Sequence, residues 1–317
     1  MKLIVQIPCF NEADTLESVV ADIPREIEGV DTVEILVIDD GSTDGTADLA
    51  RRLGVEHVVS NVGNIGLART FERGLNAALA AGADIIVNTD GDNQYRGSSI
   101  PDLIRPVLEG RADVVIGDRN TNASTEFSWL KKVLQRAGTH VVRRLSGLKV
   151  NDAVSGFRAY SRKAAMQTNV LSSFSYTTET LIQAGRRGLI IASVPVATNP
   201  STRPSRLARS MMGFVLRQVF TIVRAYVMYS PLRAIGLLAG LMMVIGTLPI
   251  LRFLYFYFSG DGDGHVQSLI LGSMFFILGY LTLVIALLAD IIASNRRLIE
   301  MTLERVRRLE LDADRNE

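Results

Sequence analysis

Short apolar runs alternate with amphipathic stretches over residues 1–200. The apolar runs are rich in Val and Ile and predict strands at residues 3–7, 33–39, 57–60, 84–89 and 113–117. The stretches between them predict helices near residues 13–28, 45–53, 65–81 and 101–109. Apolar strands that alternate with helices are typical of a mostly parallel sheet covered on both faces, so the predicted fold class is α/β.

The hydrophobic pattern changes beyond residue 205. Two uncharged, strongly apolar runs follow in succession, at residues 234–251 and 266–289. Because roughly 20 apolar residues span a bilayer, these runs predict two transmembrane helices rather than two buried helices of a soluble protein. The acidic connector at residues 259–265 contains no Lys or Arg and predicts a tight hairpin.

Arginines flank this hairpin on both sides. They are Arg206, Arg209, Arg217, Arg224 and Arg233 before it, and Arg296, Arg297, Arg305, Arg307 and Arg308 after it. The positive-inside rule therefore places both termini and the N-terminal domain in the cytoplasm, with the protein in the cell membrane. Four of the first five arginines share one narrow stripe of a helix that is otherwise apolar, which indicates a helix lying in the membrane interface.

These patterns predict four segments along the chain. They are a cytoplasmic α/β domain (1–205), an interfacial amphipathic helix (206–230), a two-helix transmembrane hairpin (231–293) and a cytoplasmic C-terminal helix (294–317).

Polar and acidic residues follow at least four of the predicted strands, in the sequences PCFNE, DDGSTD, DGDNQ and GDR. Ligands of parallel sheets bind at the carboxyl ends of the strands, and solvated turns would not share one edge of a sheet. Asp90 and Asp92 are separated by a single glycine, and such crowded carboxylates repel one another unless a cation lies between them. With Gln94 they predict a Mg²⁺ or Mn²⁺ site for a substrate diphosphate.

Several other chemistries are not supported. The net charge of +1 gives no support to nucleic-acid binding, and one cysteine, Cys9, excludes an internal disulfide. The three histidines lack the spacing of a zinc site. No G-x-x-x-x-G-K-[ST] is present, and no G-x-G-x-x-G follows the first strand, which disfavours a P-loop NTPase and a dinucleotide dehydrogenase.

The ordered motifs PCFNE, VIDDGSTDGT, NTDGDNQY, VIGDR and DAVSGFR resemble those of family 2 glycosyltransferases with a GT-A fold. Within that family the chain looks like the dolichyl- or polyprenyl-phosphate sugar synthases with a C-terminal membrane anchor. The resemblance covers residues 1–205 and extends to the hairpin.

The resemblance implies three groups of site residues. The donor nucleotide would contact Pro8, Phe10, Asn11, Glu12, Asp40, Asp90 and Gly91, and its diphosphate Arg203, Ser205 and Arg206. The metal ligands would be Asp90, Asp92 and Gln94. The acceptor phosphate would contact Arg119, Lys131 and Gln135, with Lys132 and Arg136 as neighbouring candidates. Asp92, Arg119, Lys131 and Arg203 would carry catalysis, while Glu179 and Asp152 have no assigned role.

The predicted reaction is an inverting transfer of a sugar from a nucleotide sugar, UDP-linked in preference to GDP-linked, to a polyprenyl phosphate of the undecaprenyl or dolichyl type. A phosphate monoester is already a nucleophile, so this reaction needs no general base. One alternative is transfer to a neutral, diacylglycerol-type lipid, for which Asp152 is a candidate base. Another is a non-catalytic, membrane-tethered nucleotide-sugar-binding protein. A homo-oligomer formed through the hairpins and the C-terminal helix is also consistent with the sequence.

Overall fold

The computed structural model describes residues 1–119, 152–170, 176–199, 220, 223–224, 226–228, 230–260 and 263–314. Seven of the predicted site residues lie outside these ranges: Lys131, Lys132, Gln135, Arg136, Arg203, Ser205 and Arg206. Most of the predicted interfacial helix also lies outside them. The chain divides into two compact units, Met1–Ile222 together with Glu304–Glu317, and Val223–Leu303.

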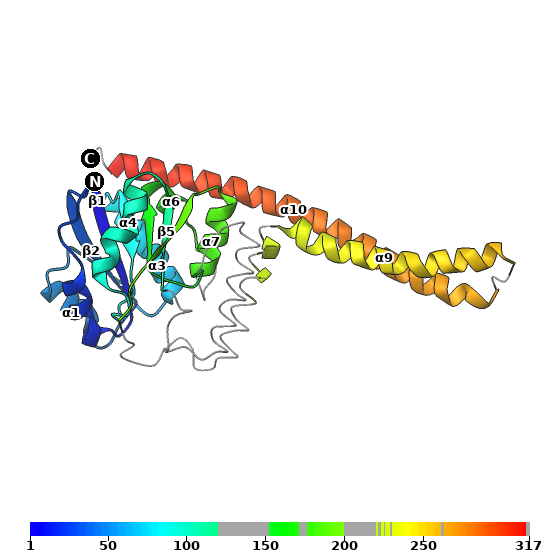
Figure 1. Cartoon of the computed structure of the whole chain (residues 1–317), viewed down its shortest axis with the longest axis horizontal. Coiled ribbons are helices and arrows are strands. Elements are labelled where there is room, and N and C mark those ends of the chain that lie inside the picture. Colours follow the sequence, from blue (N-terminus) through cyan, green and yellow to red (C-terminus); the bar gives the residue numbers. More distant parts are fainter. Residues whose placement is uncertain are drawn as a thin grey trace. The chain divides into compact units, whose positions relative to one another are not determined.

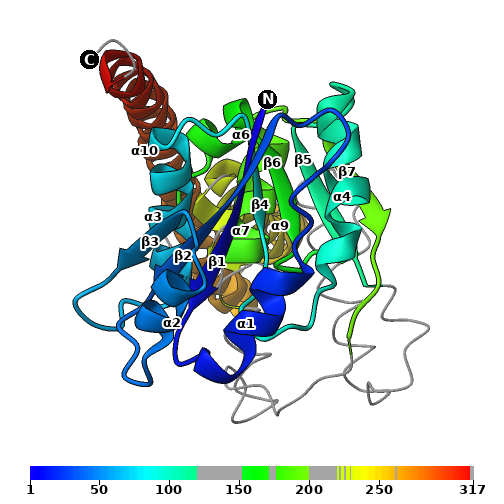
Figure 2. The same cartoon turned by 90° about the vertical axis from the view of Figure 1, so that its left-hand side faces the viewer.

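The first unit is built on a seven-stranded sheet of order β3-β2-β1-β4-β6-β5-β7. The strands are β1 (Lys2–Cys9), β2 (Thr32–Asp39), β3 (His57–Ser60), β4 (Ile85–Asn88), β5 (Val114–Asp118), β6 (Arg158–Ser161) and β7 (Ile191–Pro195). Every pairing is parallel except those of β6, which runs antiparallel to β4 and β5. The predicted mostly parallel sheet is therefore confirmed (Figure 2).

Helices cover both faces of this sheet (Figure 2). One face packs against α1 (Ala13–Asp22), α2 (Thr46–Arg52) and α4 (Ile100–Leu108), which follows the short 3₁₀ turn η1 (Gly97–Ser99). The other packs against α3 (Leu67–Ala80), α6 (Arg162–Gln167) and α7 (Tyr176–Arg186). Both faces of the central strands are consequently buried, which explains why the strands are apolar throughout.

Several elements of the first unit differ from the sequence-based expectation, which did not include α6, α7 or β7. The helix expected to reach residue 28 ends at Asp22, because Pro24 follows Ile23 and the residue before a proline avoids the helical region. Strand β6 was not predicted, because it begins with Arg158 and has no apolar alternation.

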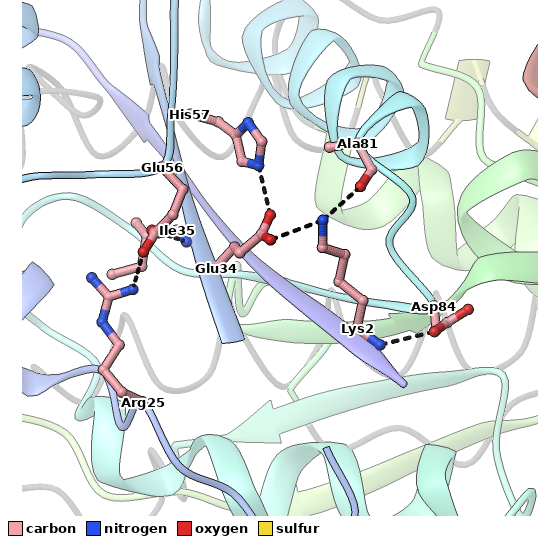
Figure 3. A network of polar contacts seen from close by, with 8 residues as sticks. All are labelled: Lys2, Arg25, Glu34, Ile35, Glu56, His57, Ala81 and Asp84. Carbon is pink, nitrogen blue, oxygen red and sulfur yellow. Dashed lines mark hydrogen bonds and ion pairs between the residues drawn. The ribbon is translucent and has the colours of Figure 1, made fainter. Parts of the chain in front are cut away.

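An ionic network links neighbouring strands at the amino ends of the sheet (Figure 3). The acidic loops lie at the opposite, carboxyl ends of the strands. Glu34 accepts from Lys2 at 2.8 Å and contacts the His57 ring nitrogen Nε2 at 2.7 Å. Lys2 also donates through Nζ to the Ala81 carbonyl and through its backbone N–H to Asp84. Burial acts to raise the pKa of Glu34, but the contacts with Lys2 and His57 outweigh it and hold the pKa below its ordinary value.

The second unit contains two long apolar helices, α9 (Pro231–Phe258) and most of α10 (Val266–Asp314), joined through the 3₁₀ turn η2 (Asp263–His265) (Figure 1). Both are long and apolar enough to cross a membrane. Helix α10 continues through the segment for which a separate C-terminal helix was expected, since no Gly or Pro interrupts residues 280–314.

Small residues form the contact between α9 and α10. Ala239, Gly246, Gly272, Gly279 and Ala286 follow heptad spacing on the two helices. A Cβ placed on Gly246 would lie 2.5 Å from the Phe276 nitrogen and 2.7 Å from the Gly272 oxygen. The two backbones therefore approach as closely as glycine allows, while large apolar side chains point outward from the hairpin.

The last turns of α10 belong to the first unit. Arg307 donates through Nη1 to the carbonyls of Met166 and Thr168, at 3.1 and 3.3 Å. Gln167 donates through Nε2 to Glu304 at 3.1 Å. The end of α10 is thus packed against the carboxyl end of α6, where the charged side chain of Arg307 donates to the terminal carbonyls.

Candidate active site

The loops that follow β1 and β2 are joined by backbone-to-side-chain hydrogen bonds. Asn11 adopts a φ of 55°, and its Oδ1 accepts from the Thr43 nitrogen at 2.9 Å. Its own backbone N–H donates to Ser42 Oγ at 2.9 Å, and that of Glu12 donates to Thr46 Oγ1 at 3.0 Å. These bonds place the predicted donor-binding residues after β1 beside the acidic loop after β2, and Phe10 among them is exposed.

The carboxylate of Asp40 makes more hydrogen bonds within the protein than the sequence suggested. Its carboxylate accepts from Asn61 Nδ2 at 2.8 Å and from the backbone N–H groups of Ile65 and Gly66 at 2.9 and 3.0 Å. Only 3% of the residue is exposed. A carboxylate offers about four lone-pair positions, so three are already used in shaping the loop between β3 and α3. Direct contact of Asp40 with a nucleotide stays a prediction.

The paired-acid loop follows β4 and is held against α1. Thr15 donates through Oγ1 to the Gly91 carbonyl at 2.7 Å. A Cβ on Gly91 would lie 3.1 Å from Cys9 Sγ and 3.2 Å from Glu12 Cγ, so only glycine fits without displacing a neighbour. This close approach fixes the loop between Asp90 and Asp92 next to the carboxyl end of β1.

Asp90 lies against the backbone of Gly156, where a Cβ would come within 3.1 Å of Oδ1. Burial of the carboxyl group, followed by the charge of Asp92, raises the pKa of Asp90 to about 7, although the positive charge of Arg119 opposes the shift. Near neutral pH this group is therefore poised between its protonated and ionised forms. A bound cation would favour the ionised form.

The donor atoms at this loop fit Mg²⁺ or Mn²⁺. These ions are typically held by one or two carboxylates, with other positions filled by water and substrate phosphates. In the described part of the chain, no group of three or more His, Cys, Asp or Glu residues converges on one point. Asp90 and Asp92 would then supply the carboxylates and a diphosphate further oxygens. Gln94 donates its backbone N–H to Asp92 Oδ1 at 3.2 Å, while its role as a ligand stays a prediction.

Arg119 follows β5 and forms a two-point ion pair with Asp152. Nε lies 2.7 Å from Oδ2, and Nη2 lies 3.1 Å from Oδ1. The Asp152 side chain is 1% exposed and that of Arg119 20%. Burial acts to lower the pKa of Arg119, but Tyr95 and Asp152 outweigh it and raise the pKa above its ordinary value. The guanidinium is thus charged, oriented and partly open to solvent.

Arg158 organises the segment that carries Asp152 and Gly156, a role that the sequence reasoning missed. The guanidinium is fully buried and donates to the carbonyls of Ser155, Thr177 and Ala153 at 2.8, 2.8 and 3.0 Å. An arginine in an otherwise buried strand was the available signal, because a buried charge is retained only where it is well bonded.

The structure therefore brings Glu12, Asp90, Asp92 and Arg119 together at the carboxyl edge of the sheet, as predicted from the parallel topology. Pro8 is the seventh residue of β1 and runs into the same edge. Glu179 is buried on α7, and its role stays open.

Residues 4–168, more than half of the chain, match the family described as glycosyl transferase family 2. The undecaprenyl-phosphate mannosyltransferase of Micrococcus luteus is 29% identical over 206 residues, which cover 62% of this chain and 83% of that protein. The dolichyl-phosphate hexose transferase of Haloferax volcanii is 30% identical over 194 residues, covering 61% and 81%.

Among solved structures, glucosyl-3-phosphoglycerate synthase from Mycobacterium tuberculosis with Mn²⁺ and UDP-glucose superposes with a TM-score of 0.55 at 27% identity. The match covers 71% of this chain and 78% of that one. The GT-A-type fold agrees with this solved structure, and the chain belongs to glycosyl transferase family 2.

Proposed function

We propose that this glycosyltransferase moves a sugar from a nucleotide-diphosphate sugar to polyprenyl phosphate at the membrane surface. The observation that carries the proposal is the oriented guanidinium of Arg119 beside the paired acids Asp90 and Asp92. The guanidinium of Arg119 suits an anionic acceptor, and the carboxylates of Asp90 and Asp92 suit a cation bound to a diphosphate. A chain with two helices of membrane-spanning length is suited to a lipid acceptor.

The donor is proposed to bind over the loops that follow β1, β2 and β4. A divalent cation at Asp90 and Asp92 would neutralise the charge that develops on the departing nucleoside diphosphate. UDP is favoured over GDP because the solved relative from Mycobacterium tuberculosis holds UDP-glucose with Mn²⁺. Pro8, Phe10, Asn11 and Glu12 lie at the edge where the nucleoside would rest, and Arg203, Ser205 and Arg206 are proposed to contact its diphosphate.

The acceptor is proposed to be a lipid phosphate monoester, which carries about −1.5 to −2 charges at neutral pH. Its oxygen attacks the anomeric carbon directly as the bond to the diphosphate breaks, and the configuration inverts. Arg119 holds the attacking phosphate through the part of its guanidinium that Asp152 does not cover. Lys131, Lys132, Gln135 and Arg136 are proposed to complete the phosphate site.

A neutral lipid acceptor is less consistent with this geometry. Transfer to a hydroxyl needs a general base, for which Asp152 was the candidate. Both carboxylate oxygens of Asp152 accept from Arg119, and Oδ1 also accepts from the Val154 nitrogen at 3.3 Å. A carboxylate whose two oxygens are engaged in this way is poorly placed to take a proton from an acceptor hydroxyl.

The predicted topology is part of the proposal. With arginine-rich flanks on both sides of the hairpin, the catalytic unit and both termini would face the cytoplasm. A homo-oligomer formed through the hairpins and the C-terminal helix is also proposed, and the molecular mass of the detergent-solubilised protein tests it.

The direct test is transfer from radiolabelled UDP- and GDP-sugars to undecaprenyl or dolichyl phosphate by the full chain in detergent. We expect a chloroform-soluble product that is lost with EDTA and in Asp92→Ala. Product formed from diacylglycerol instead would favour the neutral acceptor. Nucleotide-sugar binding without any transfer would favour the non-catalytic alternative.

A further inference from the structure

The acidic loop is held from a second side by Asn199, at the end of the segment that follows β7. The Asn199 backbone N–H donates to the Gln94 carbonyl at 2.8 Å. Its side-chain Nδ2 donates to the Asn93 carbonyl at 3.0 Å, and its Oδ1 accepts from Arg96 Nε at 2.9 Å. A single residue thus bonds to three of the four residues that follow Asp92.

The segment that Asn199 bonds, residues 93–96, contains an unfavourable backbone conformation. Asn93 adopts a φ of 58°, in the left-handed region that non-glycine residues seldom occupy. This turn brings the Gln94 backbone N–H to within 3.2 Å of Asp92 Oδ1. The orientation of the Asp92 carboxylate therefore depends on a conformation that is not the intrinsic preference of the chain.

Thr15 cannot provide this support, because its bond is to the Gly91 carbonyl, on the other side of Asp92. Asn199 and Thr15 are far apart in the sequence and bond to the loop on either side of Asp92. An isolated β-bridge between Tyr95 and Thr198 strengthens the contact on the Asn199 side.

We propose that Asn199 is a positioning residue for the divalent cation of this site. It acts through Asn93 and Gln94 on Asp92 and makes no contact with the cation itself. The side-chain amide keeps the loop in the conformation in which the Asp92 carboxylate and Asp90 face one cation. The inference rests on the cation site of the proposed function and does not depend on which lipid accepts the sugar.

Asn199→Ala tests this proposal, because it removes the side-chain bonds to Asn93 and Arg96 and leaves the backbone bond to Gln94. Asn76→Ala is the matched control, since Asn76 is an exposed asparagine in the middle of α3. Asp92→Asn serves as the reference for a damaged site. The probe is Mn²⁺ alone, titrated into the full chain in detergent and followed by electron paramagnetic resonance of the free ion.

We expect Asn199→Ala to bind Mn²⁺ about three- to tenfold more weakly than the unaltered protein, the effect of one net hydrogen bond. Asn76→Ala should bind as the unaltered protein does. In transfer assays the Mn²⁺ concentration for half-maximal rate should rise by the same factor, while kcat at saturating Mn²⁺ stays within about twofold.

Equal Mn²⁺ binding by Asn199→Ala and the unaltered protein would overturn the proposal, as would an equal loss in both alanine variants. A lower kcat at saturating Mn²⁺ with unchanged Mn²⁺ affinity would also overturn it. Failure of lipid transfer alongside a selective loss of Mn²⁺ affinity in Asn199→Ala would reject the proposed acceptor and leave this inference standing.

Discussion

Asp152 holds Arg119 by two hydrogen bonds, at 2.7 and 3.1 Å, and so fixes the plane of the guanidinium at the carboxyl edge of the sheet. Two parallel bonds to one carboxylate define the direction of the remaining N–H groups, which a single contact would not. Because the Asp152 side chain is almost fully buried, the pair also anchors the end of β5 to the segment held by Arg158.

Replacing Asp152 with Asn should therefore damage the acceptor site without abolishing donor binding. Asn lacks the charge that orients the Arg119 guanidinium, so we expect kcat/KM for the lipid phosphate to fall by about 100-fold or more. The affinity for UDP with Mn²⁺ should change by less than about threefold. Asp102→Asn, an exposed acid on α4 that pairs with Arg105, is the control.

The pH dependence separates this role from that of a general base. If Asp152 only positions Arg119, the residual activity of Asp152→Asn keeps the shape of the pH–rate profile. Loss of the ascending limb of that profile in Asp152→Asn would show that Asp152 accepts a proton in the reaction.

Cation binding should depend on pH through Asp90. With its pKa raised to about 7, Asp90 must lose a proton before it can bind a cation. We expect the apparent affinity for Mn²⁺ to rise by up to about tenfold per pH unit below pH 7 and to level off above it. Electron paramagnetic resonance of free Mn²⁺ between pH 5.5 and about 8.5 measures this, and a flat profile would contradict it.

The raised pKa of Asp90 also makes the folding stability of the protein depend on pH. A carboxyl group whose pKa is raised on folding binds its proton more tightly in the folded state. The cation-free protein should therefore lose stability as the pH rises from the ordinary value of 3.8 to about 7. Added Mn²⁺ should restore part of that stability at pH 8 and little of it at pH 5, as thermal unfolding in detergent would report.

The arrangement of Asp90, Asp92 and Arg119 could be predicted from sequence because parallel strands bring their carboxyl ends to one edge. No knowledge of side-chain contacts was needed for that step. The two membrane-length helices were equally predictable, since their length and composition alone identify them.

The bonds that orient these residues were not predictable. Asn199 is distant in sequence from Asp92, and only the pairing of β7 with β5 brings it near. Arg158 lies in a strand that has no strand-like pattern, so its burial depends on the antiparallel insertion of β6. For Asp40, sequence showed an acid in the correct loop and gave no sign that three donors already occupy its oxygens.

The contact between α9 and α10 should tolerate no side chain at Gly246. A leucine there would meet the backbone of Phe276 and Gly272, so the helices must separate, at a cost of about 1–3 kcal/mol. We expect Gly246→Leu to lower the unfolding temperature of the full chain in detergent. Gly240→Leu is the matched control, because a Cβ at Gly240 has no neighbouring atom within 4 Å. Equal effects of the two substitutions would contradict the role of Gly246.

Glu34 should stabilise the fold without affecting catalysis, because it lies at the amino ends of the strands (Figure 3). Glu34→Gln removes the charge that Lys2 and His57 contact, and we expect the free energy of unfolding to fall by about 1–2 kcal/mol at pH 7.5.

Since the pKa of Glu34 is lowered on folding, its contribution to stability is present above the ordinary value of 4.5 and is lost as the pH falls below it. The difference in unfolding temperature between Glu34→Gln and the unaltered protein should therefore shrink as the pH falls below 4.5. Glu28→Gln, an exposed acid, should leave the unfolding temperature unchanged, and a loss of transfer activity in Glu34→Gln would show that the two edges of the sheet are coupled.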